Sequence, residues 1–222
     1  MSCGGVYEKD YFYQLADEYG IMIWQDFMFA CSLLSNGYRA DIFYDRYPTN
    51  IEFLKNVQDE VVYQVGRLNH HPSIVIWSGN NENELIIRYW PFSTNVDRVI
   101  HEADYRLLYV FLIRAIVQQL DQSRPFIASS PSNGVESEQD ENYIAQNPND
   151  SKYGDVHYYN YTVDSWNPSV YPIARFLSET GVQSLPSLES WLQVTNDSAE
   201  WNYSSRLMLH RQHHPDGMEQ ML

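Results

Sequence analysis

Large apolar residues in the first part of the chain follow the period of a helix and then the pattern of a buried strand. They recur every three or four positions between residues 7 and 19, which predicts a helix with one buried face that ends at Gly20. Residues 21–24 then form an unbroken apolar run that stops at Gln25 and Asp26, as in a strand covered on both faces. The apolar row of the helix consists of Tyr7, Tyr11, Phe12, Leu15 and Tyr19.

The same order of helix and strand returns twice. The pairs are 53–68 with 74–77 and 107–120 with 125–128, and two shorter strand candidates cover 156–161 and 174–178. Right-handed crossovers of this kind make parallel strands, so the polar residues that follow each strand are expected to converge. The sequence therefore predicts an α/β fold with five strands, which form either an open sheet or part of an eight-stranded barrel.

Two glutamates follow predicted strands at the edge where a parallel sheet builds its active site. Glu82 comes after the run 74–77, and Glu179 comes after the run 174–178. One carboxyl group that keeps its proton and one that stays ionised are the requirements for glycoside hydrolysis. Taken singly, each glutamate could also be a solvated loop residue or a partner of a helix N-terminus. Glu84 is a rival for the role of proton donor.

Two motifs around these glutamates carry a resemblance to a known family. Trp-Ser-Gly-Asn-Asn-Glu ends at Glu82, and Ser-Glu-x-Gly-x-Gln-Ser begins at Ser178. Together with their flanking sequences, they resemble the catalytic domain of the animal β-mannosidases of glycoside hydrolase family 2. The similar stretches are 20–32, 69–85, 124–135, 154–162 and 175–188. The resemblance implies that residues 1–222 are part of a TIM (β/α)₈ barrel, covering about strands three to seven.

The resemblance also implies roles for particular residues. Glu82 matches the acid/base and Glu179 the nucleophile, while Asn81 matches an asparagine that contacts the sugar 2-hydroxyl. The remaining expected contacts to the sugar or the nucleophile are Trp24, Asp26, Trp77, His157 and Tyr159. For these aromatic and polar residues at strand ends, ordinary packing is the alternative. No metal or organic cofactor is expected.

The implied reaction is removal of terminal β-D-mannose from the non-reducing end of oligosaccharides, with retention of configuration. By resemblance the protein is lysosomal and acts in glycoprotein catabolism. Two alternatives stay open at this point. The sugar could be that of the β-galactosidases or β-glucuronidases, which belong to the same family, or the chain could be an inactive sugar-binding or interaction fragment.

Residues 34–46 have neither a helical nor a strand period and no counterpart in the resemblance. They are expected to be an insertion. The other parts of the full-length enzyme, which are the remaining barrel strands and the preceding β-sandwich domains, are expected as partners of this chain.

Composition narrows the choice of partners. Fourteen Lys and Arg against 29 Asp and Glu leave a net charge of −15, which repels nucleic acid and anionic lipid. The chain contains no apolar run of about 18 residues, so no membrane span is expected, and its first residues lack the pattern of a signal peptide.

Two further features bear on chemical modification. We interpret Cys3 and Cys31 as two ordinary thiols. Four Asn-x-Ser/Thr sequons begin at Asn149, Asn160, Asn196 and Asn202.

Overall fold

A computed structural model of the chain describes residues 6–31, 47–92, 94–139, 141–213 and 217–220. The insertion expected at 34–46 lies outside the described residues. The described chain forms two compact units, the first of which comprises the residues up to 157 together with 173–179. Its elements before β4 are α1 (Asp10–Tyr19), β1 (Ile23–Asp26), α2 (Ile51–Leu68), β2 (Ile74–Ser78), α3 (Asn83–Tyr89), α4 (Asn95–Tyr105), the π-helix η1 (Arg106–Arg114), α5 (Ala115–Leu120), β3 (Phe126–Ile127) and α6 (Val135–Gln139).

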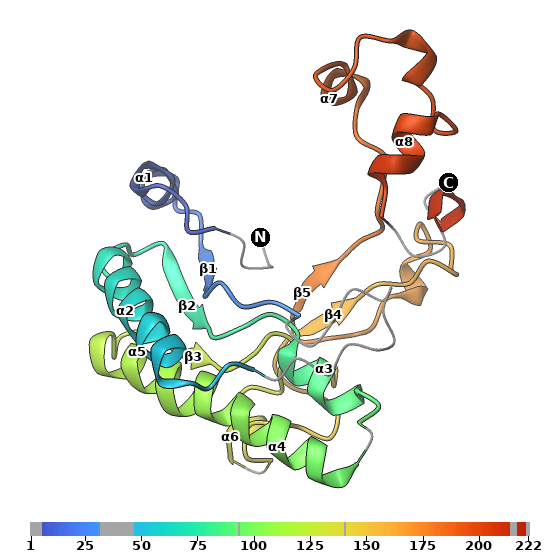
Figure 1. The fold of residues 1–222 in the computed structure, drawn as a ribbon. Helices are drawn as coiled ribbons and strands as arrows, with labels where there is room; N and C mark the ends of the chain where they lie inside the picture. Colours follow the sequence, from blue (N-terminus) through green and yellow to red (C-terminus); the bar gives the residue numbers. More distant parts are fainter. Residues whose placement is uncertain (1–5, 32–46, 93, 140, 214–216, 221–222) are drawn as a thin grey trace. The chain divides into compact units, whose positions relative to one another are not determined.

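Three parallel strands form the main sheet of the first unit, in the order β1, β2, β3 (Figure 1). In the register, Asp26 pairs with Ser78, and Ser78 pairs with Ile127. A second sheet consists of β4 (Val156–Tyr158) and β5 (Leu177–Thr180). The five expected strands are therefore present and the α/β prediction is confirmed. Within the described part of the chain they form no closed barrel.

Helix α2 follows its predicted stripe. The Asn50 side chain caps the helix by accepting a hydrogen bond from the Phe53 amide at 2.9 Å. Every fourth residue from Val57 to Val65 is buried, and the helix packs beside α5 and η1 (Figure 1). Burial of each of these valines stabilises the fold by about 1.5–3 kcal/mol.

The predicted stripe over residues 107–120 is helical, but the buried face differs from the predicted one. Tyr105, Tyr109, Ile113 and Val117, spaced every four residues, are fully buried, whereas Phe111 of the predicted row is 66% exposed. Part of this segment is the π-helix η1, in which hydrogen bonds span five residues rather than four. The inward row begins with Tyr105 and Tyr109, and the Tyr109 hydroxyl accepts from Asn83 Nδ2 at 2.9 Å. The predicted row left these tyrosines out, so it did not identify the buried face.

The predicted face of α1 is also wrong. Tyr11 and Tyr19 are 67% and 73% exposed, and the buried residues are Tyr13 and Ala16. The Tyr13 hydroxyl donates to Gln25 Oε1 at 2.7 Å, which ties the helix to β1. A tyrosine ring carries a polar hydroxyl and tolerates water, so large size alone did not identify the buried face. Gly20 ends the helix as expected, with φ of 67°.

Strand β1 lies two residues later than its apolar run predicts. Ile21 and Met22 precede the strand and are 57% and 77% exposed, while Gln25 and Asp26 at its end are buried. The polar residues expected to end the strand are therefore its buried part. The Gln25 side chain contacts Tyr13 of α1, and Asp26 pairs with Ser78 of β2.

The second unit comprises residues 158–172 and the described residues from 180 onwards. Its small core contains Trp191, Met208 and Met218, and the Trp191 indole donates to the Glu200 carbonyl at 2.8 Å. Its helices are η2 (Pro168–Val170), α7 (Leu188–Leu192), η3 (Ser198–Glu200), α8 (Arg206–Arg211) and η4 (Gly217–Gln220). Among the described residues of both units, no helix is long and apolar enough to cross a bilayer.

Candidate active site

The residues after β2 bring the neighbouring strand ends together. Asn81 lies beyond the strand and forms parallel bridges to Ala30 on one side and Ser130 on the other. Glu82 follows with φ of 61° and ψ of 2°, a left-handed conformation that is uncommon for a residue other than glycine. This conformation turns the chain from the strand end into α3. Unusual backbone conformations of this kind gather at functional sites.

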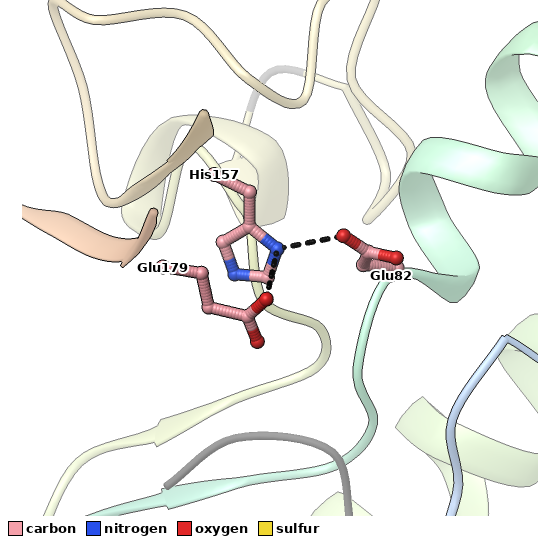
Figure 2. A group of neighbouring side chains, drawn as sticks. All are labelled: Glu82, His157 and Glu179. Atoms are coloured by element: carbon pink, nitrogen blue, oxygen red, sulfur yellow. Dashed lines mark hydrogen bonds and ion pairs between the residues drawn. The ribbon is translucent and has the colours of Figure 1, made fainter. Parts of the chain in front are cut away.

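His157 from β4 lies between the two predicted carboxylates (Figure 2). Its Nδ1 is 2.9 Å from Glu82 Oε1 and 3.5 Å from Glu179 Oε2. The His157 and Glu179 side chains are 2% and 5% exposed, against 23% for Glu82. The structure thus brings together three of the residues that the sequence analysis singled out, and one nitrogen atom faces both carboxyl groups.

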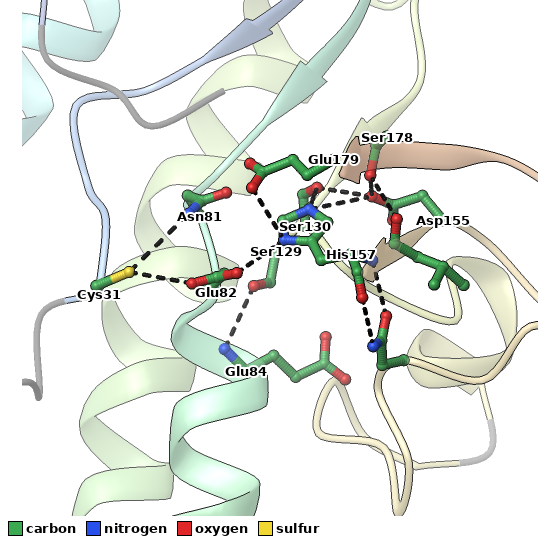
Figure 3. A network of polar contacts seen from close by, with 12 residues as sticks. Cys31, Asn81, Glu82, Glu84, Ser129, Ser130, Asp155, His157, Ser178 and Glu179 are labelled. Atoms are coloured by element: carbon green, nitrogen blue, oxygen red, sulfur yellow. Dashed lines mark hydrogen bonds and ion pairs between the residues drawn. The ribbon is translucent and has the colours of Figure 1, made fainter. Parts of the chain in front are cut away.

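A second polar group holds the opposite side of the His157 ring (Figure 3). The Ser130 and Ser178 hydroxyls donate to Asp155 Oδ2 at 2.7 and 2.6 Å. The Ser130 hydrogen points to Asp155, so the Ser130 oxygen is placed to accept from His157 Nε2 at 3.0 Å. Nδ1 is then the ring nitrogen that faces the two glutamates.

The backbone before Asp155 allows no other residue than glycine. A Cβ atom on Gly154 would lie 1.8 Å from the Ser132 carbonyl oxygen. This close approach brings the Ser132 amide to Asp155 Oδ1 at 3.0 Å. The chain at 154 thereby places the carboxylate that organises the Ser130 and Ser178 hydroxyls.

Glu82 has two donors on its carboxylate. The hydrogen bond from His157 lowers the pKa of Glu82, and the Cys31 thiol, whose Sγ is 3.3 Å from Oε2, lowers it further against the opposing effect of burial. In this arrangement Glu82 favours its ionised form. Cys31, interpreted from the sequence as an ordinary thiol, is thus in direct contact with the predicted acid/base.

Asp26 at the end of β1 is 5% exposed, and neither carboxylate oxygen has a hydrogen-bond partner among the described residues. Burial raises the pKa of Asp26 to about 6 and the nearby charge of Glu179 adds to the shift, against the lowering effect of the Ser78 and Trp24 side chains. A buried carboxyl group whose oxygens make no well-formed hydrogen bond can accept hydrogen bonds from a ligand.

Glu84, the rival for the acid role, lies in a different environment. It is 1% exposed, and its Oε1 accepts from the Ala145 amide at 2.9 Å and the Ser137 hydroxyl at 3.2 Å. Burial raises the pKa of Glu84 to about 8. Figure 3 shows its carboxyl group apart from the pair formed by His157 and Glu179.

The remaining predicted site residues divide between exposed, stacked and core positions. Trp24 is half-buried and stacks on Phe176, with ring centroids 5.9 Å apart. Trp77 is fully buried, and its indole donates to Asp121 Oδ2 at 2.9 Å. Trp77 therefore presents no surface to a sugar, and the packing alternative describes it. Tyr159 belongs to the second unit and is 50% exposed.

Four residues of the network were not identified as site residues from the sequence. Cys31 lies five positions beyond the end of β1, Ser130 follows β3, Asp155 precedes β4, and Ser178 lies in β5. Ser130 and Ser178 had a signal, since Ser130 was among the polar residues expected to converge after a strand and Ser178 begins the motif that contains Glu179. Nothing in the sequence distinguished Asp155 from the other acidic residues of its loop.

One group of side chains in the described part of the chain has metal-ligand chemistry. Glu82, His157 and Glu179 each offer one ligand atom, and these atoms lie within 4.8 Å of one another. The three side chains already hydrogen-bond to each other or to Ser130, so their partners are protein groups. The expectation that the reaction needs no metal stays a prediction.

Comparison with known proteins places this geometry in a family. Residues 7–170 match the family of glycosyl hydrolases family 2, TIM barrel domain. Over 220 residues the chain is 50% identical to the mouse protein named β-mannosidase, covering 99% of this chain and 23% of the mouse protein. It is 45% identical to a probable β-mannosidase of Caenorhabditis elegans, covering 97% and 22% of the two chains.

Solved structures of two other proteins resemble this chain. The crystal structure of a β-D-mannosidase from Dictyoglomus thermophilum superposes with a TM-score of 0.75 and 32% identity, over 99% of this chain and 24% of that one. A Bacteroides uniformis β-glucuronidase shares the fold alone, with a TM-score of 0.54 and 15% identity over 83% and 20% of the two chains. The chain spans about a quarter of the length of these relatives, and it belongs to glycosyl hydrolase family 2, as a part of the TIM barrel domain.

Proposed function

We propose that residues 1–222 are part of the catalytic domain of a retaining β-mannosidase that removes terminal β-D-mannose from the non-reducing ends of oligosaccharides. One observation carries the proposal: His157 joins Glu82 and Glu179, with one carboxylate oxygen of each within 4.8 Å of the other. Retaining glycosidases hold their two carboxyl groups about 5–5.5 Å apart, whereas inverting enzymes need about 6.5–9.5 Å.

In the first step of the proposed reaction, a Glu179 carboxylate oxygen bonds to the anomeric carbon. The glycosidic C–O bond breaks, and the leaving oxygen takes the proton of Glu82. In the second step, a water molecule gives a proton to Glu82 and its oxygen displaces Glu179 from the anomeric carbon. Two displacements at one carbon return the β configuration and the protonated Glu82.

His157 is placed to influence the protonation of Glu82 during the proposed reaction. While Nδ1 donates to Glu82 at 2.9 Å, Glu82 favours the ionised form that the second step requires. A small movement of the donor toward Glu179, now 3.5 Å away, would release Glu82 to take a proton. One donor shared with the nucleophile thus acts on the acid/base.

Further sugar contacts are proposed from the resemblance. Within the first unit, Asn81 would contact the 2-hydroxyl, Asp26 would accept a hydroxyl with its buried oxygens, and Trp24 would offer aromatic surface. The role expected for Tyr159 stays a prediction. The animal relatives named β-mannosidase support mannose over galactose or glucuronic acid as the sugar. A lysosomal location and a role in glycoprotein catabolism are proposed from the family resemblance alone.

The decisive experiment measures release of chromophore from an aryl β-mannoside by the parent and by Glu179→Gln, with Glu84→Gln as a matched control. The proposal expects turnover in the parent and the control, a loss of about 10⁴-fold in Glu179→Gln, and a β-configured first product by NMR. An α-configured product or an active Glu179→Gln variant contradicts it.

The second candidate function is sugar binding without turnover. It is favoured by the two separate sheets, which form no closed barrel in the described part of the chain. Calorimetry with mannose separates the candidates: a folded parent that binds mannose without hydrolysing the aryl mannoside supports binding alone.

A further inference from the structure

The Asn149 side chain makes two hydrogen bonds to the backbone of a single residue of the site. Its Nδ2 donates to the His157 carbonyl at 2.9 Å, and its Oδ1 accepts from the His157 amide at 2.9 Å. Asn149 lies eight positions before His157, in the loop that precedes β4. A side-chain amide that meets both backbone groups of one residue imitates the pairing that a neighbouring strand would give.

The other edge of β4 is already paired. The Val156 amide donates to the Phe176 carbonyl at 2.9 Å, and backbone groups of successive strand residues point to opposite edges. Asn149 therefore hydrogen-bonds to the edge of β4 that is not paired with β5. The His157 backbone is held from the side opposite to β5.

The position of the His157 backbone decides where its ring can reach. The ring meets Glu82 at 2.9 Å, Glu179 at 3.5 Å and Ser130 at 3.0 Å, so a displacement of its Cα changes three contacts together. We propose that Asn149 is a positioning residue, which holds His157 and through it both carboxylates, and that its sequon carries no glycan in the folded protein. The catalytic part of this inference rests on the proposed function.

The exclusion of a glycan follows from amide geometry. Asn149-Asp150-Ser151 is a sequon, and a glycan would be attached to Nδ2. A secondary amide keeps its substituent on the same side as its oxygen and its remaining hydrogen on the opposite side. The closed pair of hydrogen bonds to His157 uses the hydrogen on the oxygen side. The sugar would replace the hydrogen that donates to His157, so glycosylation and this contact exclude each other.

Three variants separate the parts of the inference. Asn149→Asp keeps the shape and the acceptor for the His157 amide, but an ionised carboxylate cannot donate to the His157 carbonyl, while the protonated acid can. Asn149→Ala removes both bonds at every pH. Ser151→Ala destroys the sequon and keeps the amide. Asn160→Asp is the matched control, since Asn160 uses its Oδ1 to accept from the Thr162 amide and hydroxyl.

Each variant is expressed through the secretory pathway of insect cells. Three properties are measured: glycan occupancy by peptide mass spectrometry, the thermal midpoint, and aryl β-mannoside hydrolysis from about pH 4 to pH 7. We expect an Asn149 peptide without glycan and Ser151→Ala equal to the parent. Near pH 4, Asn149→Asp should have nearly the thermal midpoint and hydrolysis rate of the parent. Both should fall relative to the parent as pH rises, and the loss of rate should reach about 10- to 100-fold near pH 7. Asn149→Ala should be impaired throughout.

A glycan on Asn149 in the folded protein overturns the inference. So does an Asn149→Asp variant whose difference from the parent is the same at every pH, or is matched by Asn160→Asp. If the parent itself shows no hydrolysis, the proposed function fails, whereas the thermal midpoints and the glycan map still decide whether Asn149 holds His157.

Discussion

Two glutamates separated by one residue, Glu82 and Glu84, belong to regions with opposite electrostatics. At the strand ends, Glu82 meets donors from His157 and Cys31, and its pKa is lowered. Where Ser137 of α6 and the Ala145 amide donate to Glu84, burial raises the pKa of that carboxyl group to about 8. A search for a protonated carboxyl group would select Glu84. Its 1% exposure leaves no access for a glycosidic oxygen, so geometry has to be considered before pKa.

The largest expected effect is the contrast in activity between substitutions at these two positions. Glu82→Gln removes the proton donor and should lower kcat by about 10²- to 10⁴-fold, whereas Glu84→Gln keeps a neutral acceptor for Ala145 and Ser137 and should stay within about threefold of the parent. Steady-state kinetics with an aryl β-mannoside measures both. Equal losses would remove the distinction between the two regions.

Asp26 tests whether burial alone separates the two regions, because it is a carboxyl group at the strand ends that is buried like Glu84. Its pKa of about 6 lies above the ordinary value of 3.8, so the native state holds the proton more tightly. The stability associated with this proton is present at acidic pH and is lost as pH rises from about 4 to 6, to a total of about 3 kcal/mol.

An asparagine side chain does not titrate, so a variant with asparagine at position 26 would not lose this stability as pH rises. Asp26→Asn should therefore unfold like the parent near pH 4 and be more stable than the parent at pH 7. Urea unfolding at the two pH values measures the difference. A parallel pH dependence in parent and variant would show that Asp26 does not titrate in this range.

Glu84→Ala tests the second region by itself. Without the carboxyl group, the Ala145 amide and the Ser137 hydroxyl lose their buried acceptor, which should destabilise the fold by about 1–3 kcal/mol. Glu84→Gln, which keeps the acceptor, is the control. Chemical denaturation at pH 6 gives both values, and an equally stable alanine variant would mean that the fold does not depend on Glu84.

Cys31→Ala should have the smallest effect. Loss of one thiol donor raises the pKa of Glu82, so the alkaline limb of kcat/KM should move to higher pH. Cys31→Ser keeps a donor and should leave the limb in place. An unshifted limb in Cys31→Ala would mean that the thiol does not act on the acid/base.

Much of the fold was predictable from short-range pattern. The stripe of α2, the end of α1 at Gly20 and the five strands follow from the sizes of neighbouring side chains and from the conformational freedom of glycine. The inward faces of α1 and of the helical segment that contains η1 were not predictable, because both buried rows contain tyrosine, which tolerates both environments. The position of Trp77 in the core was open for a similar reason, since an indole suits both a core and a sugar site.

The sequence by itself determined the family and singled out two glutamates, because the motifs around Glu82 and Glu179 are local and specific; the catalytic roles of the two residues stay a prediction. Only the tertiary structure decided what surrounds them. His157 reaches both carboxylates, Cys31 reaches Glu82, and Asn149 holds His157 from a loop, because the ends of the strands converge. Hydrogen bonds depend on distances of a few tenths of an ångström between residues far apart in the chain, and no spacing along a sequence encodes such distances.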